Sequence, residues 1–455
     1  MKTRENYKIK AIPKKARHQN AWDMFATWVG ANANNGTWYI GGVIAACGFL
    51  TASTTMFISG ILSYILMGFA GFIGFKTGLP AMTITRASFG LRGSFFTSLV
   101  NILQFIGWAA VNTFIASISV SYIMTNVFNW PAYGKPGGFK GVVLGILIMS
   151  ILHILSTSLG EHSVHLFERI GIVLVFVVVV WETIVVFQHI SLSRIIAWKP
   201  SVSIKMTSGQ SLDILVPFNF AWVTAISDFT RFSKKKSDAT WIPFLGANLG
   251  LFWFTLVGII STIATAITLH SFDANNSDPS TIASKLGLGI LAMLVIVITS
   301  TTANAVNLMS AGSALNNIVK KFSLTSCSIL VTLAAIVVTF IPVFFSNLLN
   351  LFTDFLNGIG MFLGPEIAIF LVDFYILHKQ KYHYKDFFLK EGLYWYQHGF
   401  NKAAIISWLI GITSYLILKQ ISFIANSIGV SFISMLLAGI FYWILSQRYL
   451  YKIKN

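Results

Sequence analysis

The chain has 455 residues, of which 55% are hydrophobic and 10% charged, whereas soluble globular proteins carry about 25% charged residues. The mean hydropathy of +0.73 predicts a membrane protein, and the length allows about 12 spans of about 20 residues without a separate soluble domain. The net charge of +17 would suggest nucleic-acid binding in a soluble protein, but here it must first be examined as a topology signal.

The N-terminal segment 1–22 is basic and polar and lacks the apolar core of a signal peptide, so we predict a cytoplasmic tail. If it lies inside, most Lys and Arg residues fall in inner segments such as 233–237 and 378–385. Orientation then explains the positive charge, both termini are cytoplasmic, and no nucleic-acid partner is needed. The predicted spans lie at about 24–50, 54–75, 96–126, 139–158, 163–188, 211–227, 242–268, 283–311, 326–345, 346–377, 402–423 and 427–447.

The first and sixth spans are interrupted. The first carries Asn32, Asn34, Asn35 and Gly36 near its middle, and the sixth carries Pro217 with Asn219. Such residues favour local unwinding of the helix. Unwound backbone is tolerated inside a membrane where it lines a cavity. Each of the two interruptions could also be a simple helix kink. Their positions predict an inverted five-plus-five repeat with a ligand site at the midplane. The expected units are 23–188 for the first repeat, 189–377 for the second, and 378–455 for an inner loop, two more helices and a cytoplasmic tail.

The third span places Gln104, Trp108 and Asn112 at i, i+4 and i+8, on one stripe of a helix. An indole flanked by two amides suits a flat, neutral heteroaromatic ligand, because the ring stacks and the amides satisfy its polar edge. The alternative is that Trp108 packs in the core and the amides bond neighbouring helices. Further amides at the same depth favour a site: Asn34, Asn35 and Asn219.

The eighth span is rich in hydroxyl and amide side chains. Hydroxyl and carbonyl oxygens are ligands for a hard cation such as Na+. A Thr hydroxyl in a membrane helix equally often bonds the carbonyl one turn back, so both interpretations remain open. The residues concerned are Thr299, Ser300, Thr301, Thr302, Asn304 and Asn307.

Three acidic residues lie at membrane depth, namely Glu182 in the fifth span and Asp354 and Glu366 in the tenth. Each is a possible proton carrier, because a carboxylate inside a membrane is costly and tends to be functional. Each could equally be neutral or paired near a helix end. The sequence assigns a role to none of them.

Four ordered motifs resemble the nucleobase:cation symporter family, which includes bacterial cytosine permease and hydantoin permease. The resemblance covers nearly the whole chain. It implies an all-α membrane protein of about 12 helices with the leucine-transporter-like fold, and cotransport of a nucleobase-like compound with Na+ or H+ by alternating access. The motifs lie at Lys76–Ser94, Gln104–Asn112, Ser227–Phe232 and Gly364–Tyr375.

The resemblance also implies roles for individual residues. Trp108 would stack on the substrate ring, and Asn112 would take a place usually held by Gln or a small residue. Asn219 falls where relatives place an aromatic, for which Phe218 is a substitute, and Asn307 matches a ligand-binding amide. A shifted alignment matches Asn304 instead. Family position also implies a sodium site made of the Thr301 and Thr302 hydroxyls and the carbonyls of Ala31, Asn34 and Ile298.

These inferences predict a multi-pass transporter of the cytoplasmic membrane that imports cytosine or a purine by symport with Na+ or H+. Its expected partners are the substrate, a monovalent cation and the bilayer, with no other cofactor and no obligate protein partner. Another flat heterocycle, such as allantoin, a hydantoin or hydroxymethylpyrimidine, is the alternative substrate. A membrane enzyme would need convergent catalytic groups or a metal cluster at membrane depth, and the chain offers none.

Overall fold

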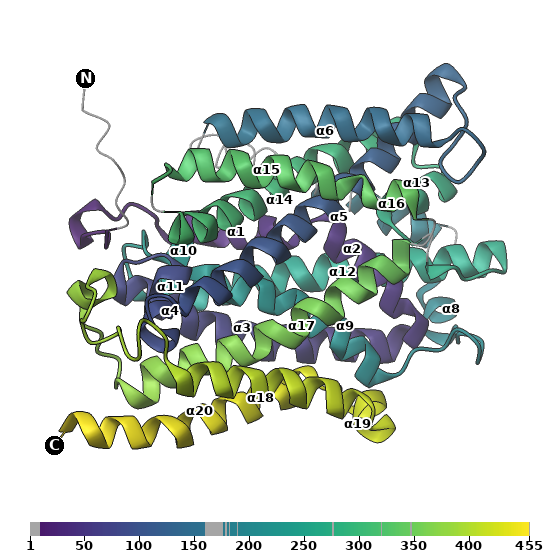
Figure 1. Cartoon of the computed structure of the whole chain (residues 1–455). Coiled ribbons are helices and arrows are strands. Elements are labelled where there is room, and N and C mark those ends of the chain that lie inside the picture. Colours follow the sequence, from purple (N-terminus) through teal and green to yellow (C-terminus); the bar gives the residue numbers. More distant parts are fainter. Residues whose placement is uncertain are drawn as a thin grey trace.

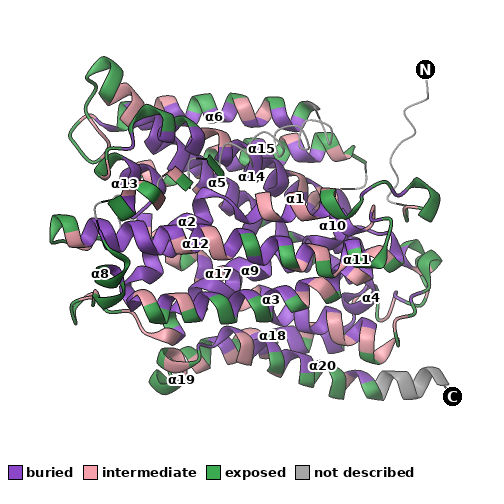
Figure 2. Ribbon diagram, turned by 180° about the vertical axis from the view of Figure 1, so that it is seen from behind, coloured by how far each residue is buried: buried purple, intermediate pink, exposed green. Residues whose placement is uncertain are grey.

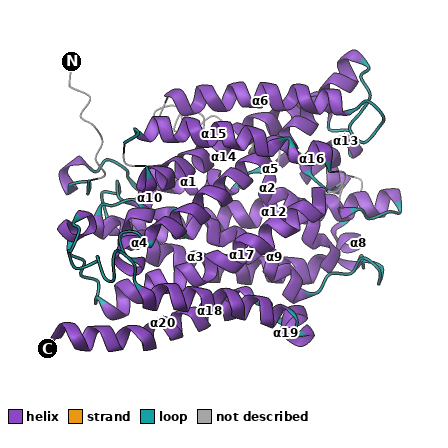
Figure 3. Cartoon of the chain, viewed as in Figure 1, coloured by secondary structure: helices purple, strands orange, loops and turns teal. Residues whose placement is uncertain are grey.

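The computed structural model describes residues 10–159, 176–177, 180–181, 183–188, 190–274, 277–319, 321–345 and 348–454. In this part of the chain the regular structure is helical, as predicted (Figure 3). The helices are α1 (Ala21–Asn32), α2 (Asn35–Ile44), α3 (Phe49–Thr77), α4 (Ala81–Phe89), α5 (Ser94–Phe128), α6 (Phe139–Leu159), α8 (Leu192–Ala197), α9 (Ser208–Val223), α10 (Ile226–Thr230), α11 (Lys236–Ala239), α12 (Trp241–Leu269), α13 (Pro279–Lys285), α14 (Gly289–Ile318), α15 (Leu324–Thr339), α16 (Ile341–Phe344), α17 (Leu348–Val372), α18 (Lys402–Lys419), α19 (Ser422–Ser427) and α20 (Ser431–Lys454).

Nine helices of the described chain are long and apolar enough to cross a membrane. They correspond to predicted spans two to four and six to eleven. The predicted first span is divided between α1 and α2, and the last corresponds to the shorter apolar helix within α20. Most of the predicted fifth span, 163–188, including Glu182, lies outside the described residues.

The long helices lie side by side in a bundle with α5 at its centre (Figure 1). Helix α5 packs on α14 and α6, whereas α18 and α20 form a pair against α17 (Figure 1). Helices α4, α10 and α11 lie at the same end of the bundle as the last turns of α20, and we call this the terminal end (Figure 1). Helices α8, α13 and α19 lie at the opposite end.

Burial follows the pattern expected for a bundle in lipid. The outward face of α3 is exposed and apolar at Phe57, Ile61, Leu62 and Ile65, whereas its inward face is buried (Figure 2). Helix α5 is buried over most of its length. Apolar side chains that would be unfavourable in water therefore face the acyl chains, and the polar residues of the predicted sites lie inside.

The predicted break in the first span is confirmed. Helix α1 ends at Asn32 and α2 begins at Asn35, with Ala33 and Asn34 between them in non-helical conformations. The Asn34 side chain caps α2 by accepting a hydrogen bond from the backbone nitrogen of Thr37. The first N–H groups of a helix have no partner within it, and water is scarce at this depth. The Asn34 cap therefore gives one of them a hydrogen-bond partner.

The predicted position of the sixth-span break was wrong. Helix α9 continues through Pro217 and Asn219 to Val223, and the interruption falls at Thr224 and Ala225, before α10. A Cβ atom on Gly360 of α17 would lie 2.6 Å from the Pro217 ring, so the glycine makes room for it. Packing against α17 thus stabilises a helical proline that the sequence alone suggested would break the helix.

Glycines allow the close crossing of α2 and α12. A Cβ atom on Gly258 would lie 2.2 Å from the carbonyl oxygen of Trp38, and one on Gly41 would lie 2.2 Å from that of Thr255. These distances leave no room for a methyl group. The crossing holds α2, and with it the break, against α12.

We expect Gly258→Ala to lower the melting temperature of the detergent-purified protein. Alanine usually favours a helix by about 1 kcal/mol over glycine, but overpacking against a backbone carbonyl costs about 1–3 kcal/mol or more. The matched control is Gly358→Ala in α17, where an added Cβ meets nothing within 4 Å. Equal melting temperatures for the two variants would contradict the proposed close contact.

Candidate functional site

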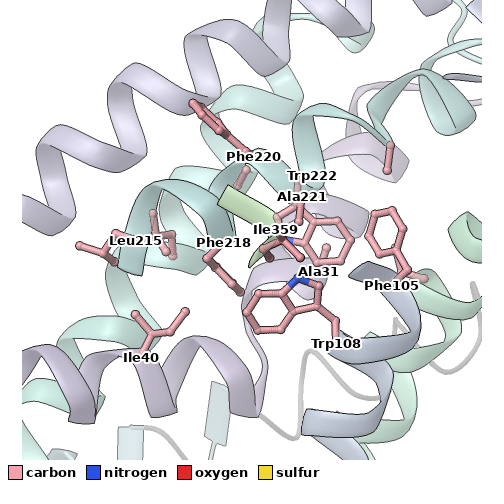
Figure 4. Packing of buried hydrophobic residues seen from close by; sticks show 14 of the residues in the cluster. Ala31, Ile40, Phe105, Trp108, Leu215, Phe218, Phe220, Ala221, Trp222 and Ile359 are labelled. Atoms are coloured by element: carbon pink, nitrogen blue, oxygen red, sulfur yellow. The ribbon is translucent and has the colours of Figure 1, made fainter. Parts of the chain in front are cut away.

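Trp108 lies in the middle of α5 beside the break between α1 and α2. Its side chain is buried, and its ring carbon Cζ3 lies 3.5 Å from the position of a Cβ atom on Gly36. Phe218 approaches the indole almost perpendicularly at 5.0 Å between centroids (Figure 4). Phe355 and Phe352 of α17 do so at 5.2 and 5.9 Å. These rings enclose Trp108, so a flat ligand that stacked on it would have to displace at least one of them.

Among the described residues, the indole Nε1 of Trp108 has no hydrogen-bond partner. An indole N–H is a donor that usually finds a partner when it is buried. A polar ligand edge would satisfy it. Trp108 thus combines an apolar face with an unused donor next to an unwound helix.

Asn112 fixes the start of α2 against α5. Its side-chain oxygen accepts a hydrogen bond of 3.1 Å from the backbone nitrogen of Gly36. Gly36 lies in the first turn of α2, where a backbone N–H has no partner within the helix. Ser300 of α14 donates to the carbonyl oxygen of Asn112 at 2.6 Å and accepts from Nδ2 of Asn35 at 2.8 Å. Asn35 also donates to the carbonyl oxygen of Ile296. The amides of Asn35 and Asn112 therefore join α2, α5 and α14 around Trp108.

Asn304 and Asn307 of α14 lie in a chain of hydrogen bonds that reaches His153 of α6. Nδ2 of Asn304 lies 3.0 Å from the carbonyl oxygen of Ala109, which can only accept, so this contact orients the amide. Nε2 of His153 contacts the same amide nitrogen at 3.1 Å. The Asn304 oxygen then accepts from Nδ2 of Asn307 at 3.2 Å. The side-chain oxygen of Asn307 has no partner in the described part of the chain and can accept from a ligand.

Gln104 lies one turn from Trp108 toward the terminal end. Its amide nitrogen donates to Oδ1 of Asn101 at 2.7 Å and contacts the Thr224 hydroxyl at 2.9 Å, at the interruption after α9. Its amide oxygen has no partner. Gln104 therefore links the Trp108 site to a second polar cluster.

Asn219 does not face Trp108. Its side-chain oxygen lies 3.0 Å from the hydroxyl of Tyr64 on α3, which also donates to Asn32 of α1 at 2.7 Å. The preceding residue, Phe218, contacts Trp108 instead. Helix rotation explains the difference, because adjacent residues point about 100° apart.

The residues expected to hold a cation lie on α14 and at the end of α1, two helices that contact each other. Thr302 donates to the carbonyl oxygen of Thr299 at 2.8 Å and Thr301 to that of Val297 at 3.1 Å, both within their own helix. The amide of Asn34 donates to the carbonyl oxygen of Ala31 at 2.5 Å. A hydroxyl that donates one bond retains acceptor lone pairs, so Thr301 and Thr302 keep the capacity to ligate a cation. Ile298, whose carbonyl was expected to contribute, is half-buried on the same helix.

Sequence reasoning missed several residues around these sites. Phe352 and Phe355 occur in an apolar run where any Phe would fit, and Tyr64 and Thr224 carry no motif. His153 is a single histidine within a predicted span, with no second histidine or cysteine spaced to form a metal site with it. Its intramembrane position was the available signal, since polar groups there usually have specific partners.

Comparison with known proteins places the chain among membrane permeases. Residues 11–445 match the family described as permease for cytosine/purines, uracil, thiamine, allantoin. A putative purine-cytosine permease of Bacillus subtilis is 26% identical, over 96% of this chain and 91% of the relative. The allantoin permease of the same organism is 24% identical, over 97% of this chain and 93% of the relative.

The fold is shared with solved transporters. Mhp1, a nucleobase-cation-symport-1 family transporter in a closed conformation with bromovinylhydantoin bound, superposes with a TM-score of 0.78 at 17% identity. The match covers 99% of this chain and 96% of Mhp1. A Na+-coupled sialic acid symporter matches with a TM-score of 0.60 at 15% identity, over 92% of this chain and 88% of the symporter. The predicted leucine-transporter-like fold is thereby confirmed.

We expect Ser300→Ala to destabilise the protein, because the substitution removes two hydrogen bonds that join α2, α5 and α14. A buried group left unpaired costs about 1–3 kcal/mol. Ser310→Ala on the same helix is the matched control, since the Ser310 hydroxyl is buried without a partner. Thermal unfolding of both purified variants tests this, and a Ser310→Ala variant as unstable as Ser300→Ala would refute the bridging role.

Proposed function

Because the chain belongs to the nucleobase:cation symporter family, the permeases for cytosine/purines, uracil, thiamine and allantoin, we propose that it imports cytosine or a purine. Transport is coupled to the entry of Na+ or H+ and proceeds by alternating access. The substrate binds beside Trp108, where the broken first span meets α5 and α14.

The buried indole of Trp108, with its unpartnered Nε1, is the observation that carries this proposal. A nucleobase offers a flat ring for the indole face and acceptors for its N–H. The unpartnered oxygens of Asn307 and Gln104 are acceptors for the N–H groups of such a base. Phe218 would then pack on the bound ring after moving from the indole.

The terminal end is proposed to face the cytoplasm. The backbone of Gln19 pairs with that of Phe232 and Lys234, so the basic N-terminal segment lies against the basic loop before α11. This gathering of Lys and Arg at one end is the distribution that places it inside the cell.

Uptake of labelled cytosine, adenine, hypoxanthine, uracil, allantoin and hydantoin into cells that express the chain tests the substrate class. Accumulation of cytosine or a purine above control cells supports the proposal. Accumulation of allantoin or hydantoin alone would assign the other heterocycles instead.

In the same assay we expect Trp108→Ala to weaken apparent affinity by about 5- to 150-fold, because stacking on an aromatic is worth about 1–3 kcal/mol per base. Trp108→Phe keeps an aromatic face and loses the N–H, so it should lose less. A correctly inserted alanine variant with wild-type affinity would show that Trp108 only packs and that the substrate binds elsewhere.

We further propose that Na+ binds where α14 faces the break, with ligands from Thr301, Thr302 and the carbonyls of Ala31, Asn34 and Ile298. Carbonyls at a helix break and hydroxyls beside them supply oxygen ligands without a fixed negative charge. The ion and the substrate share the broken span, so each should tighten binding of the other by the same factor.

Replacing Thr302 by Ala should therefore lower Na+ affinity and abolish the Na+ dependence of base binding while some weak binding persists. The measurement is a base-binding titration at fixed pH in which choline replaces sodium. Wild-type affinity that is indifferent to sodium would exclude this site.

A further inference from the structure

The structure separates the three acidic residues that the sequence placed at membrane depth. Glu182 lies outside the described residues, and Asp354 is exposed on α17. Glu366, three turns further along α17, is only 1% exposed. Of the two that the structure describes, Glu366 is therefore the one that packing inside the bundle removes from both water and lipid.

Glu366 has too few partners for an ionised carboxylate. Among the described residues its hydrogen-bond partner is Nδ2 of Asn101, 3.3 Å from Oε1, and Oε2 has none. An isolated buried charge is strongly unfavourable, and a carboxyl group in such a place avoids the cost by holding a proton. The geometry thus fits a neutral acid whose proton lies on Oε2.

Nearby charged groups do not neutralise it. Arg86 of α4 donates to the carbonyl oxygens of Phe387 and Asn317, and Asp228 of α10 accepts from Ala81 and Ser313. Helix α5 carries no charged residue, and its Tyr122 lies four turns beyond Trp108. Among residues whose side chains the structure describes, the other titratable groups on the elements packed around α17 are Asp213, Asp373, Tyr375, Lys402, Tyr415, Lys419 and Tyr442.

The groups with described contacts are engaged elsewhere. Asp213 accepts from the backbone of Val430 and Ser431. Asp373 accepts from Tyr442 and lies 3.3 Å from Nδ1 of His378. Although burial opposes its charged form, the charge and hydrogen bonds of Asp373 raise the pKa of His378. The imidazole of His378 therefore contacts Asp373 rather than Glu366.

A small cavity adjoins Glu366 on the side of the terminal end. It is lined by α4, α9, α10 and α17, through residues that include Met82, Thr85, Thr224 and Ser227. Thr224 belongs to the interruption after α9, and α4 and α10 lie at the end proposed to face the cytoplasm. If these short helices moved, water entering from the terminal end would reach Glu366 before Trp108.

The same carboxyl group is connected to the substrate site. Asn101, which donates to Glu366, accepts from Gln104 at 2.7 Å and from Thr224 at 2.7 Å. Gln104 lies one turn from Trp108 on α5. A change in the charge of Glu366 therefore acts on groups that contact both the substrate site and the sixth-span break.

We propose that Glu366 is a proton-binding site whose occupancy follows the state of the inner half of the pathway. The acid is neutral while the pathway is closed, and Oε2 releases its proton to water that enters the cavity when α4 and α10 move. This inference rests on the proposed transport function, but it uses different residues from the sodium site. By linkage, above the pH at which the acid ionises in the free protein, a base that closes the pathway takes up one proton as it binds.

Infrared spectroscopy of the purified protein tests the protonation state without any substrate. Wild type should show the carbonyl stretch of a protonated carboxylic acid at neutral pH. Glu366→Gln should lose this band, and Asp354→Asn, the same change on an exposed carboxyl of α17, should keep it. A wild-type protein without the band, or Glu366→Gln with the band intact, overturns the proposal.

Binding of labelled cytosine at constant sodium tests the coupling. Wild-type affinity should fall by up to tenfold per pH unit above the titration range of the acid, since one proton is bound with each base. Glu366→Gln mimics the neutral acid, so it should bind at all pH values as wild type does at low pH. Asp354→Asn should follow wild type.

The outcomes distinguish the two levels of inference. If the wild-type protein shows the acid band but binds neither cytosine nor a purine, the proposed substrate is wrong and the proton-site proposal is unaffected. Cytosine binding with the same pH dependence in wild type and Glu366→Gln overturns the proton site and leaves the substrate proposal standing.

Discussion

The structure depends on how the unwound backbone between α1 and α2 is satisfied. At bilayer depth no water is available to the free groups at the two helix ends, so the protein must supply their partners. Asn34 caps α2, Asn112 accepts from Gly36, and Ser300 fastens α5 to Asn35. Asn34 belongs to the break itself, whereas Asn112 and Ser300 come from α5 and α14, two helices far from the break in sequence. The break can therefore exist only when those helices are assembled, and the same assembly places Trp108 beside it.

Polar groups inside the bundle fall into two classes. Those with obligatory partners, such as Asn304 against the carbonyl of Ala109, hold helices in register and orient their neighbours. Others lack a hydrogen-bond partner among the described residues, such as Nε1 of Trp108, Oδ1 of Asn307 and Oε2 of Glu366, and a buried group without a partner is unfavourable. The proposed substrate and proton sites are both built on such groups.

Much of the fold was predictable because lipid restricts the choices. Spans such as 139–158 and 242–268 correspond to α6 and α12 to within a residue or two, since apolar length alone defines them. The prediction for Pro217 failed for a reason that no local pattern carries. Its ring packs at Gly360, which lies in another span, and this contact keeps α9 helical past the proline. The sequence also could not show that the side-chain oxygen of Asn219 contacts Tyr64 of α3, because that contact depends on the rotation of α9 in the bundle.

The sequence by itself determined that the chain is a helical membrane protein, that its first span is broken and that Trp108 lies on a polar stripe. These features follow from composition and helical periodicity, which are local properties. Only the tertiary structure decided which amides face one another, where the sixth span is interrupted and which of the two acidic residues of α17 is buried. Glu366 and Asp354 are equivalent in sequence, but one points into the bundle and the other is exposed. That difference arises from packing between helices, and packing depends on residues hundreds of positions apart.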